Sequence, residues 1–316
     1  MVGPADWRST FGLGSGGTNM MLEPPSYALI TPARNEAANL RRLGACLVLQ
    51  TLAPTQWIIV DDGSTDETAD VARELADTAH WISTMPCPMT VGRGDALEVG
   101  RRSGRDVVAF TAGVDALRES WEIVVKLDAD VSFEADFFER LIGEFTADPS
   151  LGIASGTCYE RERGRWRPYH VAREHARGAT RAYRRECLSE IGPLEHQIGW
   201  DAVDEIRANL ADWSTRSLLD LPFYHHRKLG ERDGARGQWQ AQGQMAHYLD
   251  YRLSYLVLRT CWRALREPAA LLMIPSFLAA RLRKQPRCAD KAVRRRLRAE
   301  QSVRTLPLRI RQSLGR

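Results

Sequence analysis

The sequence predicts an α/β fold in which helices flank a mostly parallel β-sheet. Short apolar runs alternate with amphipathic segments over the first half of the chain, and strands that alternate with helices form right-handed βαβ units with parallel strands. Polar clusters follow directly on three of the apolar runs, as PARNEA, DDGSTD and DAD. Ligands bind outside the carboxyl ends of the strands in such sheets, so we expect these three segments to meet at one edge.

The first four strands and the helices between them can be placed from the hydrophobic period. Strands are expected in YALITPA, QWIIVDDGS, HWIST and WEIVVKLDAD. Helices are expected over 35–50, 64–77 and about 104–117. Asn35 is the expected N-cap of the first helix, because an Asn side chain accepts a hydrogen bond from a free N–H of the first turn.

The second half of the chain mixes strands and helices less regularly. A helix is expected in FFERLIGEF, strands in GIASGTCYE and TRSLLDLPFYHH, and a helix in GWDAVDEIRANL. A single amphipathic helix is expected over 248–265, with leucines on one face and four arginines largely off it. The expected organisation is a disordered segment over 1–25, the α/β domain over 26–245, and amphipathic helices with a basic tail over 246–316.

Positive charge is concentrated near the C-terminus. The net charge is +4, but 13 Lys and Arg stand against two acidic residues from Arg281 onward, which leaves −7 for the rest. Basic residues beside an apolar helix face are typical of proteins that bind an anionic membrane surface. The alternative is that this face packs on the α/β domain and that the tail is solvated. We expect no nucleic-acid partner.

No segment has the pattern of a signal peptide or of a membrane-spanning helix. The first 25 residues lack a basic start followed by an apolar run, and no window has the roughly 20 consecutive apolar residues that a span needs. The six cysteines form no CxxC pair, which argues against a zinc knuckle or a disulfide framework. We expect a cytoplasmic protein, peripheral at the inner face of the cell membrane.

Asp128 and Asp130 end the fourth apolar run with two carboxylates. Side chains two residues apart share a face of an extended segment, and two carboxylates about 4 Å apart repel by about 4 kcal/mol at an effective dielectric of 20. A positive group is therefore expected beside them. Mg²⁺ or Mn²⁺ fits this position, because such ions bind one or two carboxylates together with phosphate oxygens of a substrate. The alternative is a turn or a helix cap.

Five segments, taken in order, resemble the family-2 glycosyltransferases, which have the Rossmann-like GT-A fold. They are PARNEA, VDDGSTDET, LDADVSF, GWDAVDE and HHR, spread from about Tyr27 to Arg227. A lone DxD is common, but the ordered set is specific. The resemblance implies a metal-dependent, inverting hexosyltransferase. Such an enzyme moves a sugar from a nucleotide diphosphate donor to a hydroxyl of a glycan or polyprenyl-linked acceptor, in polysaccharide or glycolipid biosynthesis.

The resemblance also assigns residues to the donor. Asp130 is implied as the direct metal ligand. A basic residue before a helix supports the diphosphate in the family, and windows at Arg93 and Arg105 compete for this role. Spacing favours Arg105, because one helix and one strand fit between it and the DAD segment. Contacts to the nucleotide sugar are implied for five further residues: Pro32, Arg34, Glu36, Asp62 and Asp128.

The segment GWDAVDE is expected to supply the catalytic base. Family members carry a Glu-Asp pair here, and counting back from Arg207 places the Asp at Asp201 and puts Trp200 where the Glu would be. A carboxylate near an apolar ring can have a raised pKa and take a proton from an acceptor hydroxyl. Asp204 and Glu205 are rivals for this role. Capping of the helix by Asp201 is the non-catalytic alternative.

The last strand ends in two histidines, of which only one is expected to reach the site, because side chains alternate along a strand. His225 is preferred to His226 as a metal ligand. Gly178 and Trp200 are placed on the acceptor side. Two other functions stay open: a non-catalytic sugar-nucleotide-binding homologue, because Trp replaces the Glu, and a nucleotidyltransferase, although a Gly-rich loop is absent after the first strand.

Overall fold

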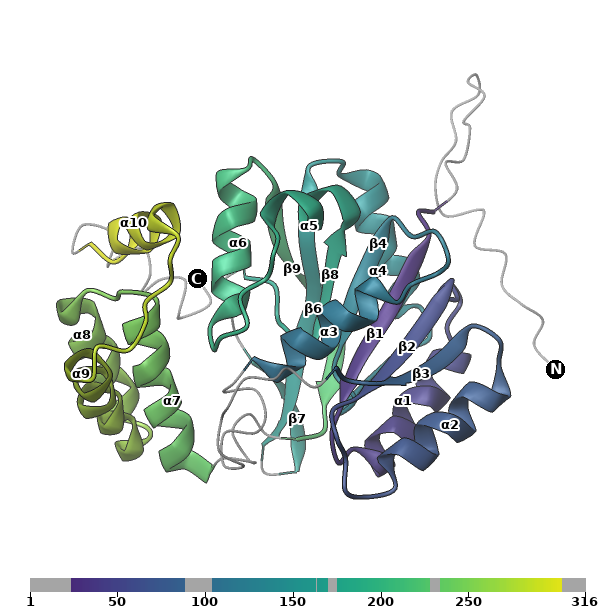
Figure 1. The fold of residues 1–316 in the computed structure, drawn as a ribbon, viewed down its shortest axis with the longest axis horizontal. Coiled ribbons are helices and arrows are strands. Elements are labelled where there is room, and N and C mark those ends of the chain that lie inside the picture. The colour runs from purple at the N-terminus through teal and green to yellow at the C-terminus, as the bar shows by residue number, and fades with distance from the viewer. Residues whose placement is uncertain (1–23, 89–103, 163, 170–174, 228–233, 303–316) are drawn as a thin grey trace.

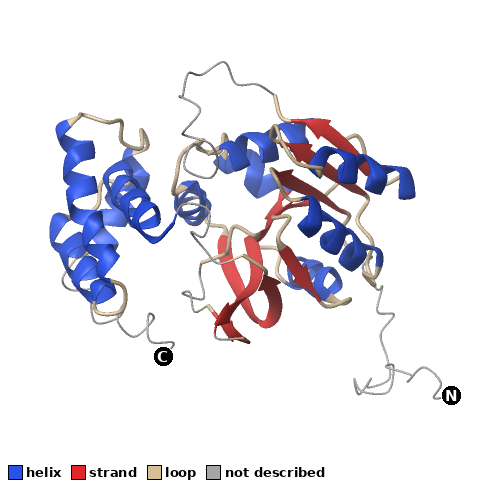
Figure 2. Ribbon diagram, turned by 90° about the horizontal axis from the view of Figure 1, so that it is seen from below, coloured by secondary structure: helices blue, strands red, loops and turns tan. Residues whose placement is uncertain are grey.

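The computed structural model describes residues 24–88, 104–162, 164–169, 175–227 and 234–302. Within these ranges the chain forms a nine-stranded sheet flanked by helices, with a group of C-terminal helices beside it (Figures 1 and 2). The strand order is β3-β2-β1-β4-β8-β6-β9-β5, and β7 pairs with β6. The predicted α/β fold class is confirmed.

The N-terminal strands pair in parallel, as predicted. They are β1 (Tyr27–Ala33), β2 (Gln56–Asp61), β3 (Ile82–Pro86) and β4 (Ile123–Leu127). The later strands pair mostly antiparallel, although β6 and β9 are parallel. They are β5 (Val131–Phe133), β6 (Leu151–Glu162), β7 (Arg165–Pro168), β8 (Thr180–Arg184) and β9 (Ser214–His225).

Two apolar clusters form the core, one on each face of the sheet. Consecutive residues of β1 show the division, since Leu29 belongs to one cluster and Ile30 to the other. Strands buried on both faces need apolar side chains at every position, which explains the uninterrupted runs in the sequence. The first face is covered by α1 (Ala37–Val48), α2 (Thr68–Thr78) and α4 (Phe137–Ala147). The second is covered by α3 (Arg105–Asp115), α5 (Arg185–Ile191) and α6 (Trp200–Leu210).

The C-terminal helices form a separate bundle that packs against α6 (Figure 2). They are α7 (Gly234–Tyr248), α8 (Leu253–Ala264), the 3-10 helix η3 (Pro268–Leu272), α9 (Met273–Leu282) and α10 (Lys291–Glu300). The single helix predicted over 248–265 is wrong, because the chain turns between α7 and α8 at Asp250, whose φ is 57°. The predicted domain boundary at 245 falls within α7, and residues 1–23 and 303–316 lie outside the described ranges.

Two local predictions at the ligand edge need correction. The fourth strand ends at Leu127, before the DAD segment. Asn35, whose φ is 53°, does not cap α1. Its side-chain oxygen instead accepts a hydrogen bond from the Thr65 N–H at 2.8 Å, and its own N–H donates to Ser64 Oγ at 3.0 Å. Asn35 therefore joins the loops that follow β1 and β2. None of the described helices is long and apolar enough to cross a membrane.

Candidate active site

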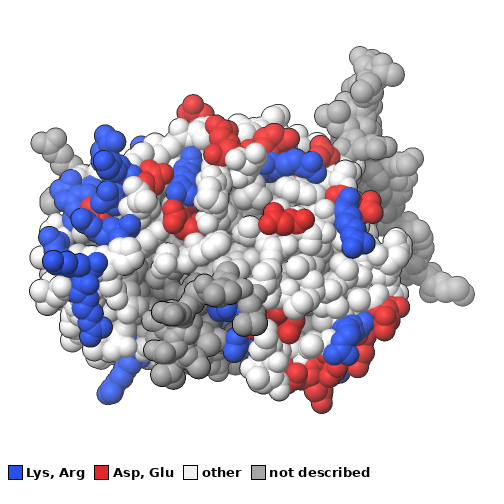
Figure 3. Space-filling model, in the orientation of Figure 1, with Lys and Arg blue, Asp and Glu red and all other residues white. Residues whose placement is uncertain are grey.

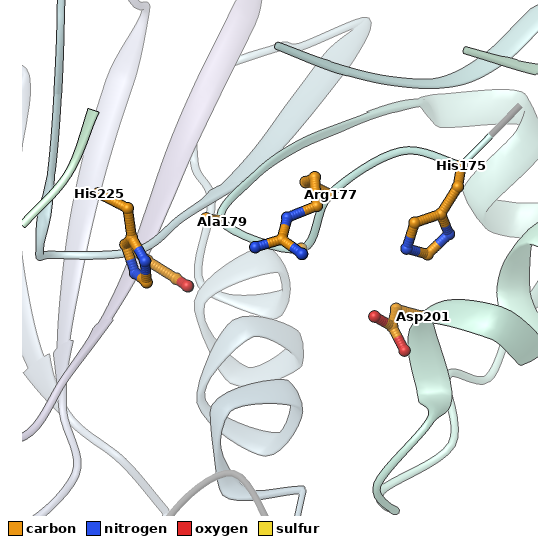
Figure 4. A pocket seen from close by; sticks show the side chains of 7 residues that line it. His175, Arg177, Ala179, Asp201 and His225 are labelled. Carbon is orange, nitrogen blue, oxygen red and sulfur yellow. The ribbon is translucent and has the colours of Figure 1, made fainter. Parts of the chain in front are cut away.

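A pocket opens where the sequence places its polar clusters. Its walls come from the turn after β4, the segment before β8, the first turn of α6 and the end of β9. Figure 4 shows Arg177 in the middle, with His225 on one side and His175 and Asp201 on the other. The lining residues are Asp128, His175, Arg177, Gly178, Ala179, Asp201 and His225.

The two aspartates of the DAD segment converge on a histidine. They lie in a turn between β4 and β5, not in an extended strand as predicted. One ligand atom from each of Asp128, Asp130 and His225 lies within 4.8 Å of the others. The pairing of β5 with β9 places Val131 opposite His225, which brings the His225 ring beside Asp130. His226, by contrast, contacts Ser132 Oγ through Nε2 at 2.7 Å.

Part of the positive charge expected beside these carboxylates comes from the chain itself. Lys126 Nζ donates to Asp128 Oδ1 at 2.6 Å. His225 Nε2 lies 3.1 Å from Asp130 Oδ1, and the Arg227 guanidinium lies 3.6 Å from Asp130 Oδ2. Burial alone would raise the pKa of Asp130, but these cationic neighbours hold it below its usual value. Burial alone would lower the pKa of His225, yet the Asp130 carboxylate raises it.

The donor-side residues predicted from the first two motifs form a connected group. Arg105 binds the Asp62 carboxylate through Nε, at 2.8 Å and 2.9 Å to its two oxygens. Arg34 donates to the Asp62 carbonyl at 2.9 Å. Gly104, with a φ of 66°, is the N-cap residue of α3 and directly precedes Arg105. A Cβ on Gly104 would lie 2.4 Å from the backbone carbonyl carbon of His196. The competing window around Arg93 lies outside the described residues.

A second ion pair joins the first motif to the last strand. Arg227 donates to both oxygens of Glu36, each at 2.7 Å. Since Arg227 also lies near Asp130, the Glu36 loop and the DAD turn share one cation. Pro32 pairs with Val60 within the parallel ladder of β1 and β2, one residue before the end of β1. Four of the predicted nucleotide-side residues therefore lie in ion pairs that link different loops: Arg34, Glu36, Asp62 and Arg105.

Asp204 and Glu205 do not reach the pocket, because a buried arginine binds both. Arg181, on β8, is fully buried, and its Nη2 donates to Asp204 Oδ1 at 2.6 Å. Its Nη1 lies 3.1 Å from Glu205 Oε1. The Tyr183 hydroxyl also donates to Asp204. Burial raises the pKa of Asp204 to about 7 even though Arg181 opposes the rise.

Asp201 is the carboxylate of α6 that lines the pocket. Its backbone carbonyl accepts a hydrogen bond from Arg181 Nη2 at 2.9 Å, so the buried ion pair also fixes the first turn of the helix. Gly199, with a φ of 90°, precedes this turn, and a Cβ there would lie 2.8 Å from Met245 of α7. The position of Asp201 is therefore set by β8 on one side and by the C-terminal helices on the other.

The two residues assigned to the acceptor side lie in different surroundings. Gly178 lines the pocket, and its carbonyl lies 3.4 Å from Lys126 Nζ. Trp200 is only 2% exposed and packs in the core behind the pocket. Its ring lies 5.6 Å from Lys126 Nζ and equally far from the Arg181 guanidinium. Trp200 thus contacts the two cations behind the pocket, and does not line it.

Five residues of the site were not assigned from the sequence. Lys126 is a charged residue within an otherwise apolar strand, which is the signal that could have drawn attention to it. Arg181 stands in TRAYR with a second arginine, and nothing in this segment marks it as buried. Arg177 lies in a basic segment where any of several arginines fits the pattern. His175 carries a raised pKa, since the nearby Glu205 carboxylate outweighs the opposing effect of burial. Arg227 stands in the HHR segment that carried the resemblance.

The residues present fit a hard divalent cation. Asp128, Asp130 and His225 offer two carboxylates and an imidazole at one wall of the pocket, a donor set that suits Mg²⁺ or Mn²⁺. Cys158, Glu160 and His225 also lie within 4.8 Å of one another. This second set offers one carboxylate and a soft sulfur atom, whereas the first offers two carboxylates, so the first set suits a hard cation better.

Comparisons with known proteins agree with the fold. A family model described as glycosyl transferase family 2 matches residues 28–196, which ends before Asp201 and His225. A 4,4'-diaponeurosporenoate glycosyltransferase of Staphylococcus aureus (strain bovine RF122 / ET3-1) is 29% identical over 156 residues, covering 48% of this chain and 34% of the relative. The match thus spans about a third of the length of that curated relative.

A solved structure extends the likeness over most of the chain. It is the mannosyltransferase PcManGT from Pyrobaculum calidifontis in complex with GDP-Man and Mn²⁺. The TM-score is 0.51 at 19% sequence identity, and the alignment covers 92% of this chain and 84% of the other. At this identity the likeness shows a shared fold.

Proposed function

This chain belongs to glycosyl transferase family 2, and from that membership we propose that it transfers a sugar from a nucleotide diphosphate donor to a hydroxyl group of an acceptor. One observation supports this proposal above the others. A carboxylate suited to act as a base, Asp201, lines the same pocket as Asp128 and His225, which belong to the candidate metal set. Family-2 likeness further suggests inversion at the anomeric carbon of the sugar.

The donor would lie along the edge of the sheet. Arg34, Asp62 and Arg105 form one end of this edge and would hold the nucleoside and the first phosphate. Arg177 lies between the two ends of the pocket, with its guanidinium on the Tyr169 ring at 4.6 Å. An arginine fork matches the geometry of phosphate oxygens, so we assign Arg177 to the leaving diphosphate.

A divalent cation completes the donor site in this proposal. Asp130, Asp128 and His225 would hold it, with Asp130 as the direct ligand and Mg²⁺ or Mn²⁺ as the ion. When bound, the ion neutralises the charge that develops on the leaving diphosphate. Lys126 and Arg227, which already contact these aspartates, would keep both carboxylates oriented. The mannosyltransferase structure is a complex with GDP-Man and Mn²⁺, which is consistent with this assignment.

Asp201 acts as the general base. It would accept the proton of the acceptor hydroxyl as the oxygen attacks the anomeric carbon, on the side opposite the leaving diphosphate. The bond from oxygen to that carbon forms while the bond from the carbon to the diphosphate breaks. Asp204 and Glu205 are bound by Arg181 behind the pocket, which leaves Asp201 as the candidate from α6. Gly178 borders the space that an acceptor would occupy.

The acceptor is proposed to be a glycan or a polyprenyl-linked sugar, in the synthesis of a cell-surface polysaccharide or a glycolipid. The proposed location is the inner face of the cell membrane, where the basic C-terminal helices would meet anionic lipid. The basic tail that contributed to this prediction lies partly in residues 303–316, outside the described ranges.

A non-catalytic sugar-nucleotide-binding protein is the second candidate. Trp200 stands where family members carry the Glu of their Glu-Asp pair, and its side chain is buried outside the pocket. Of the two carboxylates of that pair, this chain therefore keeps only Asp201. Such a protein would bind the donor with the metal but release no free sugar or product.

A donor panel separates these functions. Thermal shifts would be measured with UDP, GDP and dTDP sugars, with and without Mn²⁺, because a ligand that binds the folded state raises the melting temperature by mass action. The transferase proposal predicts a metal-dependent shift with at least one donor, and slow hydrolysis of that donor. A shift without any hydrolysis or transfer favours the binding protein. No shift with any donor contradicts both.

A further inference from the structure

The solvent-facing side of α8 is apolar. With 3.6 residues per turn, eight residues between Leu253 and Leu265 fall within one half of the helix circumference, and they include Ser254, the exposed Cys261 and the half-buried Ala264. The other five are large apolar side chains with exposed fractions between 39% and 79%: Leu253, Val257, Leu258, Trp262 and Leu265. Soluble proteins rarely leave so continuous an apolar surface open to water.

The opposite side of α8 fixes this orientation. Leu256 and Thr260 are fully buried, and Leu256 packs in a cluster with Met273 and Phe277 of α9. Thr260 Oγ1 lies 3.9 Å from Met273 Sδ. Arg259 is held by Gln242 of α7 at 3.1 Å. Rotating the helix to bury its apolar half would break these contacts, so the exposed face is a consequence of how the bundle packs.

Positive charge borders the apolar face. Arg259, Arg263 and Arg266 lie along one of its edges, and residues 250–300 contain 13 Lys and Arg against four acidic residues. Among the described residues, neither Arg263 nor Arg266 has an ion-pair partner, and both are exposed. In Figure 3, basic side chains gather over the part of the surface where Figure 1 places α10 and α8.

We propose that the apolar face of α8 is a membrane-docking surface that inserts Leu258, Trp262 and their neighbours among the headgroups of an anionic lipid layer. A helix with an apolar half and a basic edge lies in the plane of such a surface, and the arginines match its negative charge. A second copy of the chain fits less well, because it would bring the same basic edge against this one.

This inference deepens the proposed location of the enzyme and rests on it for its biological sense. The C-terminal end of α7, which precedes α8, packs with Val203 and Ile206 of α6, the helix that carries Asp201. Docking through α8 would therefore hold the pocket in a fixed orientation over the lipid. A lipid-linked acceptor would then approach from the surface on which the protein is anchored.

Vesicle sedimentation with the full chain tests the proposal. The protein should sediment with vesicles of phosphatidylcholine and phosphatidylglycerol, and much less with phosphatidylcholine alone. The double variant Leu258→Gln/Trp262→Gln should bind at least about tenfold more weakly. Arg263→Gln/Arg266→Gln should weaken binding by about fivefold for each charge removed. The matched control is Val48→Gln/Leu49→Gln, which changes two apolar residues of the α/β domain that are more exposed than Leu258 and Trp262 and should leave binding unchanged.

A fluorescent label reports insertion directly. Cys261 is exposed within the face, whereas Cys46 is half-buried on α1 and the other four cysteines are buried. A bimane on Cys261, in a Cys46→Ser background, should shift to the blue when anionic vesicles are added. The same label on Cys46, in a Cys261→Ser background, should not shift.

Three outcomes would overturn the proposal. The first is vesicle binding that both α8 variants leave intact, and the second is binding without a shift of the Cys261 label. The third is a dimer in solution that the Leu258→Gln/Trp262→Gln variant dissociates, with no vesicle binding, since this would assign the face to a second copy. These results do not depend on sugar transfer, so the failure of the docking surface and the failure of the proposed activity can be told apart.

Discussion

At the scale of single residues, the side chains around the pocket divide between ion pairs and the pocket itself. Asp204 and Glu205 are bound by Arg181, whereas Asp201, three residues before Asp204 on the same helix, lines the pocket. Residues three and four positions apart lie on the same face of a helix, so the division arises from the neighbours that each residue meets along α6. Asp201 lies in the first turn beside the pocket, whereas Asp204 and Glu205 lie one turn further along, where Arg181 of β8 binds them. Position on the helix, not residue type, thus determines which carboxylate is available for chemistry.

Replacing Asp201 by Asn should lower kcat for sugar transfer by about 10²- to 10⁴-fold, the contribution expected of a general base. Donor affinity should change little, since Asp201 contacts the acceptor side in this account. Steady-state kinetics and donor titrations would measure the two effects. Asp212→Asn is the control, because Asp212 lies just beyond the other end of α6 and its φ of 62° suits Asn. Equal kcat values for wild type and Asp201→Asn would remove Asp201 from the mechanism.

His175 should contribute to stability in a way that depends on pH. Its pKa is raised in the folded state by Glu205, whose carboxylate lies 2.8 Å from Nδ1. The folded protein therefore holds the proton more tightly than the unfolded chain, and the stabilisation is fully present below about pH 6.5. It is lost as the pH rises through the folded pKa.

Melting curves of wild type and His175→Gln would test this expectation. The melting temperatures should differ most near about pH 6 and converge at alkaline pH. The exposed His80→Gln variant controls for the loss of a histidine elsewhere. A difference that grows with pH would show that the ion pair with Glu205 does not stabilise the folded protein.

At the scale of elements, β8 and α6 are joined by an ion pair that water does not reach. Arg181 and Asp204 have side chains 0% and 1% exposed. Removing one partner leaves a buried charge without compensation, which is far more costly than losing an exposed pair. The same arginine holds the backbone of Asp201, so stability and the geometry of the base depend on one side chain.

Arg181→Ala should destabilise the protein by about 3–5 kcal/mol, and it should also lower transfer activity in whatever protein remains folded. Denaturant unfolding would give the free energy. Arg41→Ala removes an arginine from an exposed pair with Glu74 and should cost less than about 1 kcal/mol. Similar losses for the two variants would contradict the structural role assigned to the buried pair.

The elements also show how far a sequence can be read without its structure. The parallel strands and the helix after Gly104 were predicted because each depends on a local hydrophobic period. The break between α7 and α8 was missed, since Asp250 adopts a left-handed conformation that favours Gly. Arg181 was also missed: a buried arginine is explained only by Asp204 and Glu205, which lie on a different element and meet it through the tertiary fold.

The DAD segment shows a similar limit at the site. Its two carboxylates were expected to converge with a positive group, and they do, with Lys126 and Arg227 in contact. The local conformation was predicted incorrectly, because the aspartates lie in a turn and meet His225 through pairing of β5 with β9. Motif order predicted which residues would gather, but strand pairing across 95 positions of the chain determined how they meet.

At the scale of the whole molecule, α6 joins the sheet to the C-terminal helices. The sheet presents the carboxylates of the DAD turn, β8 anchors the first turn of α6 through Arg181, and the C-terminal helices pack on the far side of α6. The bundle thus supports the helix that carries Asp201 and also presents the apolar face of α8. A membrane surface and a sugar-transfer site would be connected through this one helix.

The central claim is that a divalent ion and a nucleotide diphosphate share the pocket with Asp201. Crystals grown with Mn²⁺ and the nucleoside diphosphate of the preferred donor would test it most directly, by anomalous diffraction at the manganese absorption edge. We predict one strong anomalous peak for a manganese ion that Asp130 ligates, with His225 or Asp128 as a further ligand. The diphosphate should lie between this ion and Arg177. A manganese peak away from these residues, or a diphosphate bound without one, would contradict the account.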